Sequence, residues 1–179
     1  MKPINFKHWI EENRHLLKPP VGNKQIWEDR DFMVTVVGGP NARMDFHVNE
    51  GEEFFYQVEG NITLRIIDPD EASHSGEANE SPKFRDIPIR EGEIFLLPPR
   101  VPHSPQRPPG TVGLVLERKR AKSELDGFIW FCENCGQKLH ETFVHVTHLV
   151  EQLPGIFKRF FDDETHCVCK KCGTRAQKN

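Results

Sequence analysis

The chain has 179 residues, and its 24 Lys and Arg against 27 Asp and Glu give a formal net charge of -3. This length allows one full core with a small appendage, but not two full-sized domains. The balance of charge argues against a protein bound to nucleic acid or to an anionic membrane, and favours a small-molecule ligand. Because no apolar run approaches the length of a membrane span or signal segment, we expect a cytoplasmic protein.

A short helix is predicted at the start of the chain. Residues 5–17 place apolar side chains on one helical face, and Pro19 and Pro20 end the pattern. The pattern then changes to seven short β-rich runs separated by Gly, Pro and Asn, at residues 32–39, 43–48, 53–60, 61–68, 84–90, 93–99 and 111–118. Such runs predict an antiparallel sandwich or barrel.

Three polar stretches connect these runs. Residues 59–61 (EGN) are a predicted hairpin turn and residues 90–93 (REGE) a second turn, because Gly suits the backbone conformations that tight turns require. The acidic, Ser- and Gly-rich stretch at 69–84 is predicted to be a solvated loop, and we assign it no role.

A small second unit is predicted after the β-rich region. The charged segment 119–127 ends in Gly just before a new aromatic run, so we divide the chain into a barrel of residues 1–125 and a unit of residues 126–179. Within this unit residues 147–161 predict a helix, which Pro154 and Gly155 should break or kink in the middle.

One predicted strand carries charge on a single face. Alternation puts Arg43, Asp45 and His47 on one side of it, and Met44 and Phe46 on the other. The spacing H-x5-E-x6-G starts at His47, and G-x5-P-x4-H follows later in the chain and ends at a histidine in a predicted loop. The residues that match these two motifs are His47, Glu53, Gly60, Gly92, Pro98 and His103.

These paired motifs resemble those of the cupin superfamily, which implies a jelly-roll β-barrel that holds a metal. The chain departs from the pattern at Asn49, where many cupins have a third histidine, and at Arg100, where they often have glycine. Three protein ligands, His47, Glu53 and His103, are therefore expected. Two histidines and a carboxylate form the facial arrangement of non-haem Fe(II) oxygenases, which leaves open positions for substrate and dioxygen. The other seven histidines are expected to lie outside the catalytic site.

Two arginines and a glutamate are candidates for the same cavity. Arg43 shares a strand face with His47, Arg107 follows four residues after His103, and Glu117 shares a face with Gly113 and Val115. With a dication bound, the formal charges leave the pocket positive, which suits a dianion such as an aromatic carboxylate with an ionised phenol. The alternative, left open by these residues alone, is that Arg43, Arg107 and Glu117 form ordinary ion pairs.

The chain as a whole resembles the 3-hydroxyanthranilate 3,4-dioxygenases of bacteria and fungi. The resemblance rests on residues 19–24 (PPVGNK), 43–60, 95–107 (FLLPPRVPHSPQR), 113–118 (GLVLER) and a closing pair of C-x-x-C motifs. It implies an enzyme that opens the ring of 3-hydroxyanthranilate with dioxygen to give 2-amino-3-carboxymuconate semialdehyde, which cyclises to quinolinate. This reaction belongs to the kynurenine pathway of tryptophan breakdown and to NAD synthesis.

The resemblance also implies roles for individual residues. His47, Glu53 and His103 would hold the catalytic Fe(II), and Arg43 and Arg107 would hold the substrate carboxylate and dioxygen. Glu117 would take the hydroxyl proton. Asn23 would close over the substrate in a loop. A homodimer is implied as well.

Four cysteines form a second predicted metal site. "CENC" and "CKKC" are two knuckles, each followed by Gly, and such a pair indicates a tetrahedral four-thiolate site of Cys132, Cys135, Cys169 and Cys172. Spacing does not choose between zinc and iron, whereas the resemblance implies a structural, rubredoxin-like iron centre. The unit has few apolar residues, so this metal should support its folding. Cys167 has no assigned role.

Two other functions also fit parts of the sequence pattern. Cupins with the same three ligands also serve as metal-dependent isomerases and small-molecule sensors, which use no oxygen chemistry. Alternatively, the cysteine knuckles form a ribbon that binds protein or nucleic acid, with the barrel as a passive scaffold. The second alternative leaves Arg43, Arg107 and Glu117 unexplained, and the acidic composition speaks against nucleic acid.

Overall fold

The computed structural model describes residues 2–19, 22–28, 30–68 and 82–177. Most of the predicted acidic loop, including His74, lies outside these ranges, as do Pro20 and Val21. Helix α1 (Phe6–Asn13) and a 3-10 turn (Arg14–Leu16) open the chain, and α3 (Leu149–Asp162) and α4 (Glu164–Cys167) come near its end. The strands between them are β1 (Asn23–Gln25), β2 (Phe32–Gly38), β3 (Asn41–Ala42), β4 (Asp45–Val48), β5 (Glu53–Glu59), β6 (Ile62–Ile67), β7 (Phe84–Ile89), β8 (Ile94–Leu97), β9 (His103–Arg107), β10 (Val112–Arg118), β11 (Asp126–Phe131) and β12 (Lys138–Val144).

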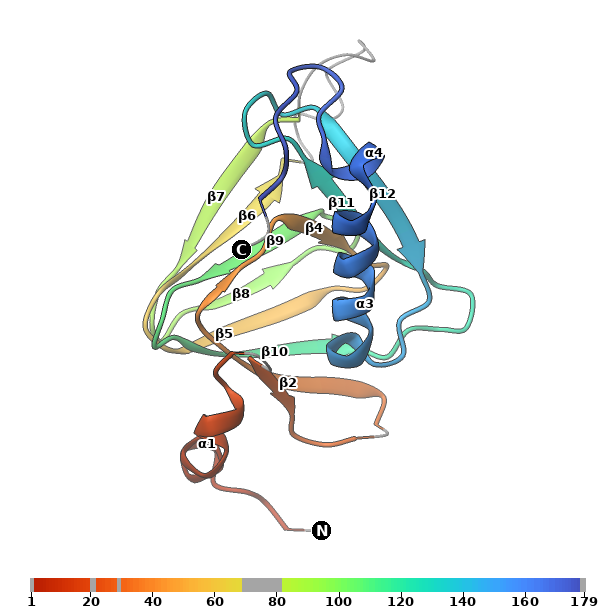
Figure 1. The fold of residues 1–179 in the computed structure, drawn as a ribbon. Helices are drawn as coiled ribbons and strands as arrows, with labels where there is room; N and C mark the ends of the chain where they lie inside the picture. Colours follow the sequence, from red (N-terminus) through yellow and green to blue (C-terminus); the bar gives the residue numbers. More distant parts are fainter. Residues whose placement is uncertain (1, 20–21, 29, 69–81, 178–179) are drawn as a thin grey trace.

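The strands form two antiparallel sheets that enclose the barrel interior (Figure 1). One sheet has the order β1-β2-β10-β5-β8, and the other has the order β12-β11-β4-β9-β6-β7, with β3 paired to β9. Alternate residues of β5 are buried, as expected for a strand with one face on a core. Inward side chains such as Phe55, Leu64, Ile89 and Leu97 form the main apolar core. The predicted mainly β fold with a short N-terminal helix is confirmed.

The predicted turns form at their glycines, but the turn at 59–61 is not the expected hairpin, because β5 and β6 belong to different sheets and do not pair with each other. Strands β7 and β8, on either side of the second turn, also belong to different sheets. Gly60 connects β5 to β6 and Gly92 connects β7 to β8, and both have positive φ, at 65° and 83°. This backbone conformation is open to glycine at little steric cost. Residues 103–107, in contrast, were expected to be a loop and form strand β9. Pro105 speaks against a strand in sequence, but β9 pairs with β6 on both sides of it, through Ser104 and Gln106.

The C-terminal part of the chain packs directly on the barrel. Strand β11 pairs with β4 as well as with β12, so the predicted boundary after residue 125 falls inside a hydrogen-bonded sheet. A boundary after β12 fits this pairing better, and the division into two units stays a prediction. Helix α3 stands across the open side between the two sheets, whereas α1 lies at the opposite end below β2 (Figure 1).

Helix α3 continues through Pro154, where a break was expected. Its apolar face explains this, because Ile156 and Phe160 are buried against Phe128 and Trp130 of β11. The rings of Trp130 and Phe160 stack with centroids 4.5 Å apart. Burial of large side chains, each worth about 1.5–3 kcal/mol, offsets the backbone hydrogen bond that proline cannot donate.

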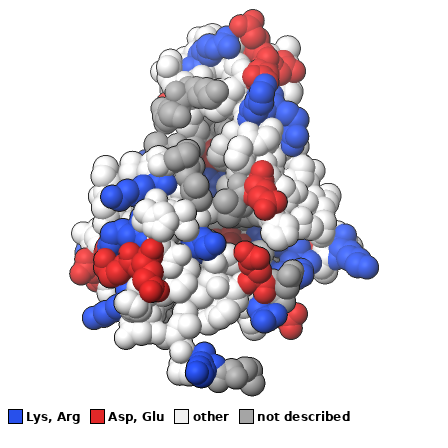
Figure 2. Space-filling model, turned by 60° about the horizontal axis from the view of Figure 1, so that its bottom comes forward, with Lys and Arg blue, Asp and Glu red and all other residues white. Residues whose placement is uncertain are grey.

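The described helices include none that is long and apolar enough to cross a bilayer. On the face shown in Figure 2, Lys and Arg side chains (blue) are interspersed with Asp and Glu side chains (red), and neither sign forms a continuous field. This face therefore offers no extended basic surface.

Candidate active site

The three predicted metal ligands meet in the barrel interior. His47 on β4 and His103 on β9 lie directly opposite each other in one sheet, and Glu53 reaches them from β5 in the other sheet. The Glu53 carboxylate oxygens lie 3.4 Å from His47 Nδ1 and 3.2 Å from His103 Nε2. Side chains from both sheets thus converge on one point, as the linked motifs predict.

The environment of these side chains fits a metal ion. All three are nearly excluded from solvent, with exposures of 2%, 3% and 2% for His47, Glu53 and His103, and the three ligand atoms lie within 4.8 Å of one another. Although burial raises the pKa of the Glu53 carboxyl, the two histidines hold this pKa well below its ordinary value. A buried carboxylate between two imidazoles is a donor set that iron, zinc and related divalent metals share.

The outer nitrogens of both histidines have fixed partners. His47 Nε2 lies 2.7 Å from a carboxylate oxygen of Asp126, and His103 Nδ1 lies 3.0 Å from the carbonyl oxygen of Val101. Burial lowers the pKa of His47, but hydrogen bonds to Asp126 and Glu53 raise it to about 9. Such partners fix the ring orientation of metal-binding histidines. Asp126 lies 79 residues from His47 in the chain, and no local motif marks it as part of the site.

Asn49, at the position where many cupins have a histidine, forms a hydrogen bond to the proposed metal ligand Glu53. It is buried, and its side-chain amide donates to a Glu53 carboxylate oxygen at 2.7 Å. The same amide nitrogen lies 3.4 Å from Glu117. Asn49 therefore links the two carboxylates, and the three-ligand interpretation needs no fourth protein ligand.

The two candidate arginines have different surroundings. Arg43 forms an ion pair with Asp45, and its guanidinium lies 5.8 Å from the ring centroid of Phe157 on α3. Arg107 is buried and donates to Gln57 Oε1 at 3.3 Å, and no carboxylate of the described residues lies within ion-pairing distance of it. The ordinary-ion-pair interpretation thus holds for Arg43 and also for Glu117, which pairs with Arg120, while Arg107 has a charge with no such partner among the described residues.

The space around Arg107 depends on a glycine. A Cβ added at Gly113 would lie 2.6 Å from Arg107 Nη1 and 2.9 Å from Gln57 Oε1. These separations are too short for real side chains, so the missing Cβ leaves the room that the guanidinium occupies. The face of β10 that carries Gly113 also carries Glu117, as the alternation predicted.

Glu117 and Asn23 both belong to sets of cross-strand neighbours that face the barrel interior. Glu117 pairs across the strands with Glu53, it is buried, and burial together with the Glu53 charge raises its carboxyl pKa. Asn23 was expected in a closing loop, but it lies on the short strand β1, paired with Val37, which is paired in turn with Gly113. Its Oδ1 atom is buried and has no hydrogen-bond partner among the described residues. An unsatisfied buried acceptor is costly, and it fits contact with a ligand.

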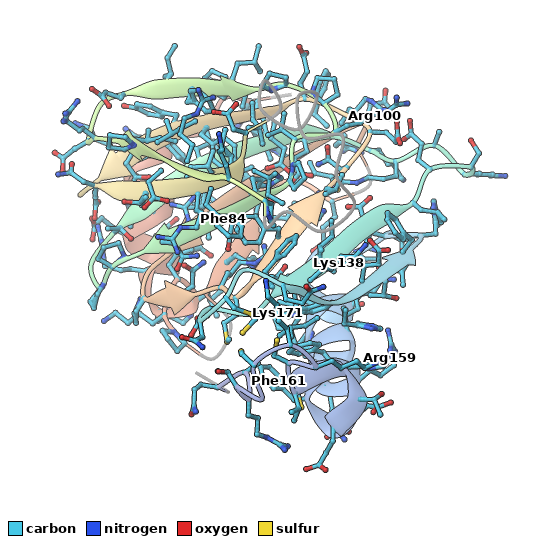
Figure 3. All side chains as sticks on the ribbon, turned by 90° about the horizontal axis from the view of Figure 1, so that it is seen from above. Phe84, Arg100, Lys138, Arg159, Phe161 and Lys171 are labelled. Carbon is cyan, nitrogen blue, oxygen red and sulfur yellow. The ribbon has the colours of Figure 1, made fainter. Side chains whose placement is uncertain are left out.

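The four predicted cysteines also come together. Cys132 and Cys172 have Sγ atoms 3.5 Å apart, and those of Cys135 and Cys169 are 3.6 Å apart. The sulfur atoms gather beside Lys171, next to the helix that carries Phe161 (Figure 3). Separations of this size match four thiolates around one tetrahedral ion, since Zn–S bonds are about 2.3 Å.

The two knuckles repeat the same backbone geometry. The amides of Gly136 and Gly173 donate to the carbonyls of Cys132 and Cys169, both at 2.8 Å, and both glycines have positive φ. Hydrogen bonds from Thr174 lower the pKa of Cys172 to about 5. A backbone hydrogen bond from Gln137 lowers the pKa of Cys135, but desolvation and hydrogen bonds with the other three sulfurs raise it to about 12. With this raised pKa, Cys135 needs a nearby cation to become a thiolate at neutral pH. Cys167 is buried in a separate apolar cluster with Trp130 and Phe160.

The fold and these sites define a β-barrel protein with a buried group of two histidines and one carboxylate and with a cluster of four cysteines, each of which could hold a metal ion. The chain belongs to the 3-hydroxyanthranilic acid dioxygenase family, whose model matches residues 1–161.

Similar proteins cover nearly the whole chain. The 3-hydroxyanthranilate 3,4-dioxygenase of Jannaschia sp. is 50% identical over 174 residues, which are 97% of this chain and 90% of that protein. The protein of the same name from Shewanella woodyi is 51% identical over 171 residues, covering 95% of this chain and 84% of that one. Among solved structures, a cupin-2 domain protein from Shewanella frigidimarina covers 65% of this chain and 94% of its own, with 18% identity and a TM-score of 0.45.

Proposed function

We propose that this protein is an Fe(II)-dependent dioxygenase that converts 3-hydroxyanthranilate and dioxygen to 2-amino-3-carboxymuconate semialdehyde. Family membership over most of the chain supports the reaction and the substrate. The observation that carries the proposal is the buried His47–Glu53–His103 set with Arg107 in the same barrel interior. An aromatic acid that binds a metal through its ring substituents and an arginine through its carboxylate suits both features.

Iron held by His47, Glu53 and His103 would supply open coordination positions and the redox chemistry that dioxygen requires. Arg107 would bind the substrate carboxylate, because a guanidinium forms two parallel hydrogen bonds with a carboxylate. Burial keeps water from competing for both groups, since a desolvated charge pair interacts more strongly than an exposed one. Arg43 would contribute less to substrate binding than Arg107, because Asp45 already pairs with it.

Glu117 would accept the proton of the substrate hydroxyl group. It lies beside Glu53 on the neighbouring strand, so it faces the same interior as the metal ligands. Its raised pKa keeps this carboxylate a better proton acceptor than an exposed one. Asn23, with its unpartnered Oδ1 on the interior-facing row, would contact the substrate amino group as a hydrogen-bond acceptor.

The four-cysteine site would hold a second iron or a zinc with a structural role. Four thiolates leave no open position on a tetrahedral ion, so the site offers no place for substrate. It joins the end of β11 to the segment after α4, which would stabilise the packing of α3 on the barrel. The homodimer, the cytoplasmic location and the place in the kynurenine pathway stay predictions.

The proposal is tested with anaerobic protein reconstituted with Fe(II). Addition of 3-hydroxyanthranilate should give tight binding, and admission of air should give oxygen uptake and the absorbance of the ring-opened semialdehyde. Binding without oxygen uptake would favour an isomerase or a sensor. Failure of 3-hydroxyanthranilate to bind would contradict the role of Arg107.

A further inference from the structure

Arg120, which no motif singles out, lies in the segment between β10 and β11 and points back into the protein. Its side chain is only 4% exposed, and its Nη1 lies 2.5 Å from Glu117 Oε2. On its other side Nη2 lies 2.7 Å from Asp126 Oδ2, and Nε lies 2.9 Å from Asp126 Oδ1. One guanidinium thus bridges two buried carboxylates.

Each of these carboxylates contacts the proposed catalytic site directly. Asp126 Oδ2 is 2.7 Å from His47 Nε2, so Arg120 fixes the group that orients a metal ligand. Glu117 is the proposed proton acceptor, and the amide of Asn49 joins it to Glu53. Arg120 therefore contacts both the carboxylate that orients His47 and the carboxylate that is the proposed base.

The chemistry of arginine suits this place. The planar guanidinium presents its N–H donors in a rigid fork, so it can hold one carboxylate through two hydrogen bonds while a further N–H binds a second. A lysine ammonium is a single point and has no such geometry. The Glu117 and Asp126 charges offset the desolvation of the buried cation, and they raise the pKa of Arg120 despite its burial.

We propose that Arg120 is a positioning residue for catalysis, which holds Asp126 so that His47 faces the metal and holds Glu117 where it accepts the substrate proton. This inference rests on the proposed function. Arg118, two residues earlier, provides the matched comparison. Its side chain is 43% exposed, and it forms its ion pair with Glu124 instead of the interior carboxylates.

The test compares R120M, R120K and R118M as full-length proteins with the four-cysteine site filled. For R120M we expect kcat to fall about 10- to 100-fold and the Fe(II) affinity of the three-residue site to fall roughly tenfold, because removal of such outer partners has effects of this size. KM for 3-hydroxyanthranilate should stay within about twofold, since Arg107 binds the carboxylate. R120K should recover only part of the loss, and R118M should match wild type.

Circular dichroism and thermal unfolding show whether each variant is folded, and Fe(II) affinity is measured by chelator competition. Folded R120M with wild-type kcat and Fe(II) affinity would overturn the inference, as would R120K with full recovery. If neither variant folds, Arg120 serves folding alone, and the inference fails. If Fe(II)-loaded wild type does not consume oxygen with the substrate, the proposed function fails, while the Fe(II) affinities still show whether Arg120 positions His47.

Discussion

Glu53 and Glu117 are cross-strand neighbours on β5 and β10, and they bring two buried carboxylates side by side. Their surroundings push their pKa values in opposite directions. The two histidines lower the pKa of Glu53, whereas burial and the Glu53 charge raise that of Glu117. Two carboxyl groups whose pKa values are shifted in opposite directions suit different tasks, here a metal ligand and a proton acceptor.

Glu117 should set the acidic limb of the pH profile. Its carboxyl has a raised pKa, so as the pH falls through that value the group gains a proton and stops accepting one from the substrate. Activity should therefore rise with pH through this range. Glu117→Gln, which keeps the size and polarity of the side chain, should lower kcat about 10²- to 10⁴-fold and abolish this limb. A pH profile of kcat for both proteins checks this, and an unchanged limb in the variant would assign the titration to another group.

Substitution of a proposed ligand should remove one metal and leave the other. Glu53→Ala deletes the carboxylate that both histidines contact, so the three-residue site should lose its iron while the four-cysteine site keeps its metal. Metal analysis per chain measures this. Glu52→Ala changes the exposed neighbouring carboxylate and should keep both metals. Loss of both metals in Glu53→Ala would show a folding defect instead of lost ligation.

Arg107 should contribute more to substrate binding than Arg43. A lost charge-assisted hydrogen bond costs about 1.5–3 kcal/mol, so Arg107→Met should weaken binding by roughly 10- to 150-fold. Arg43→Met should have a smaller effect, because Asp45 already pairs with Arg43. Calorimetric titration of the anaerobic Fe(II) protein with 3-hydroxyanthranilate gives both constants. The reverse order of effects would move the carboxylate to Arg43.

Gly113→Ala should disturb Arg107 without touching the metal. The new Cβ would meet Arg107 Nη1 and Gln57 Oε1, so the guanidinium must move and KM should rise. Iron content should stay at the wild-type level, because the atoms nearest to the new Cβ belong to Arg107 and Gln57, which are not metal ligands. Gly155→Ala, whose Cβ meets nothing within 4 Å, serves as the control. Normal KM in Gly113→Ala would show that the pocket tolerates displacement of Arg107.

The four-cysteine metal should stabilise the protein without taking part in turnover. Cys169→Ser should lose this metal and lower the Tm, because the site holds the segment after α4 against β11. Its iron-loaded catalytic site should keep kcat near wild type. Cys167→Ala should retain the metal, since Cys167 is buried among apolar side chains outside the four-cysteine set. Metal analysis and thermal unfolding test this, and a large fall in kcat for folded Cys169→Ser would contradict a structural role.

The features that depend on residues close together in the chain were the ones best predicted from the sequence. Alternation placed Asp45 and His47 on a buried face, and the motif spacing selected the three side chains that converge in the structure. Strand β9 was missed because Pro105 is atypical of paired strands, and only the pairing of its neighbours with β6 explains its formation.

Partners distant in sequence could not be predicted in the same way. Asp126 and Arg120 reach the site because β11 pairs with β4, a contact that no local pattern encodes. The ion pair of Arg43 with Asp45 depends on side-chain positions that alternation leaves open, so the charge count treated Arg43 as unpaired. Helix α3 continued through Pro154 because tertiary packing outweighed local preference.

The most direct test of iron-dependent ring cleavage is the ratio of dioxygen consumed to 3-hydroxyanthranilate consumed, measured with an oxygen electrode on Fe(II)-loaded wild type beside Glu53→Ala. We predict equimolar consumption with formation of the semialdehyde in wild type, and none in the variant. Substrate turnover without oxygen uptake, or equal activity in Glu53→Ala, would contradict iron-dependent ring cleavage at this site.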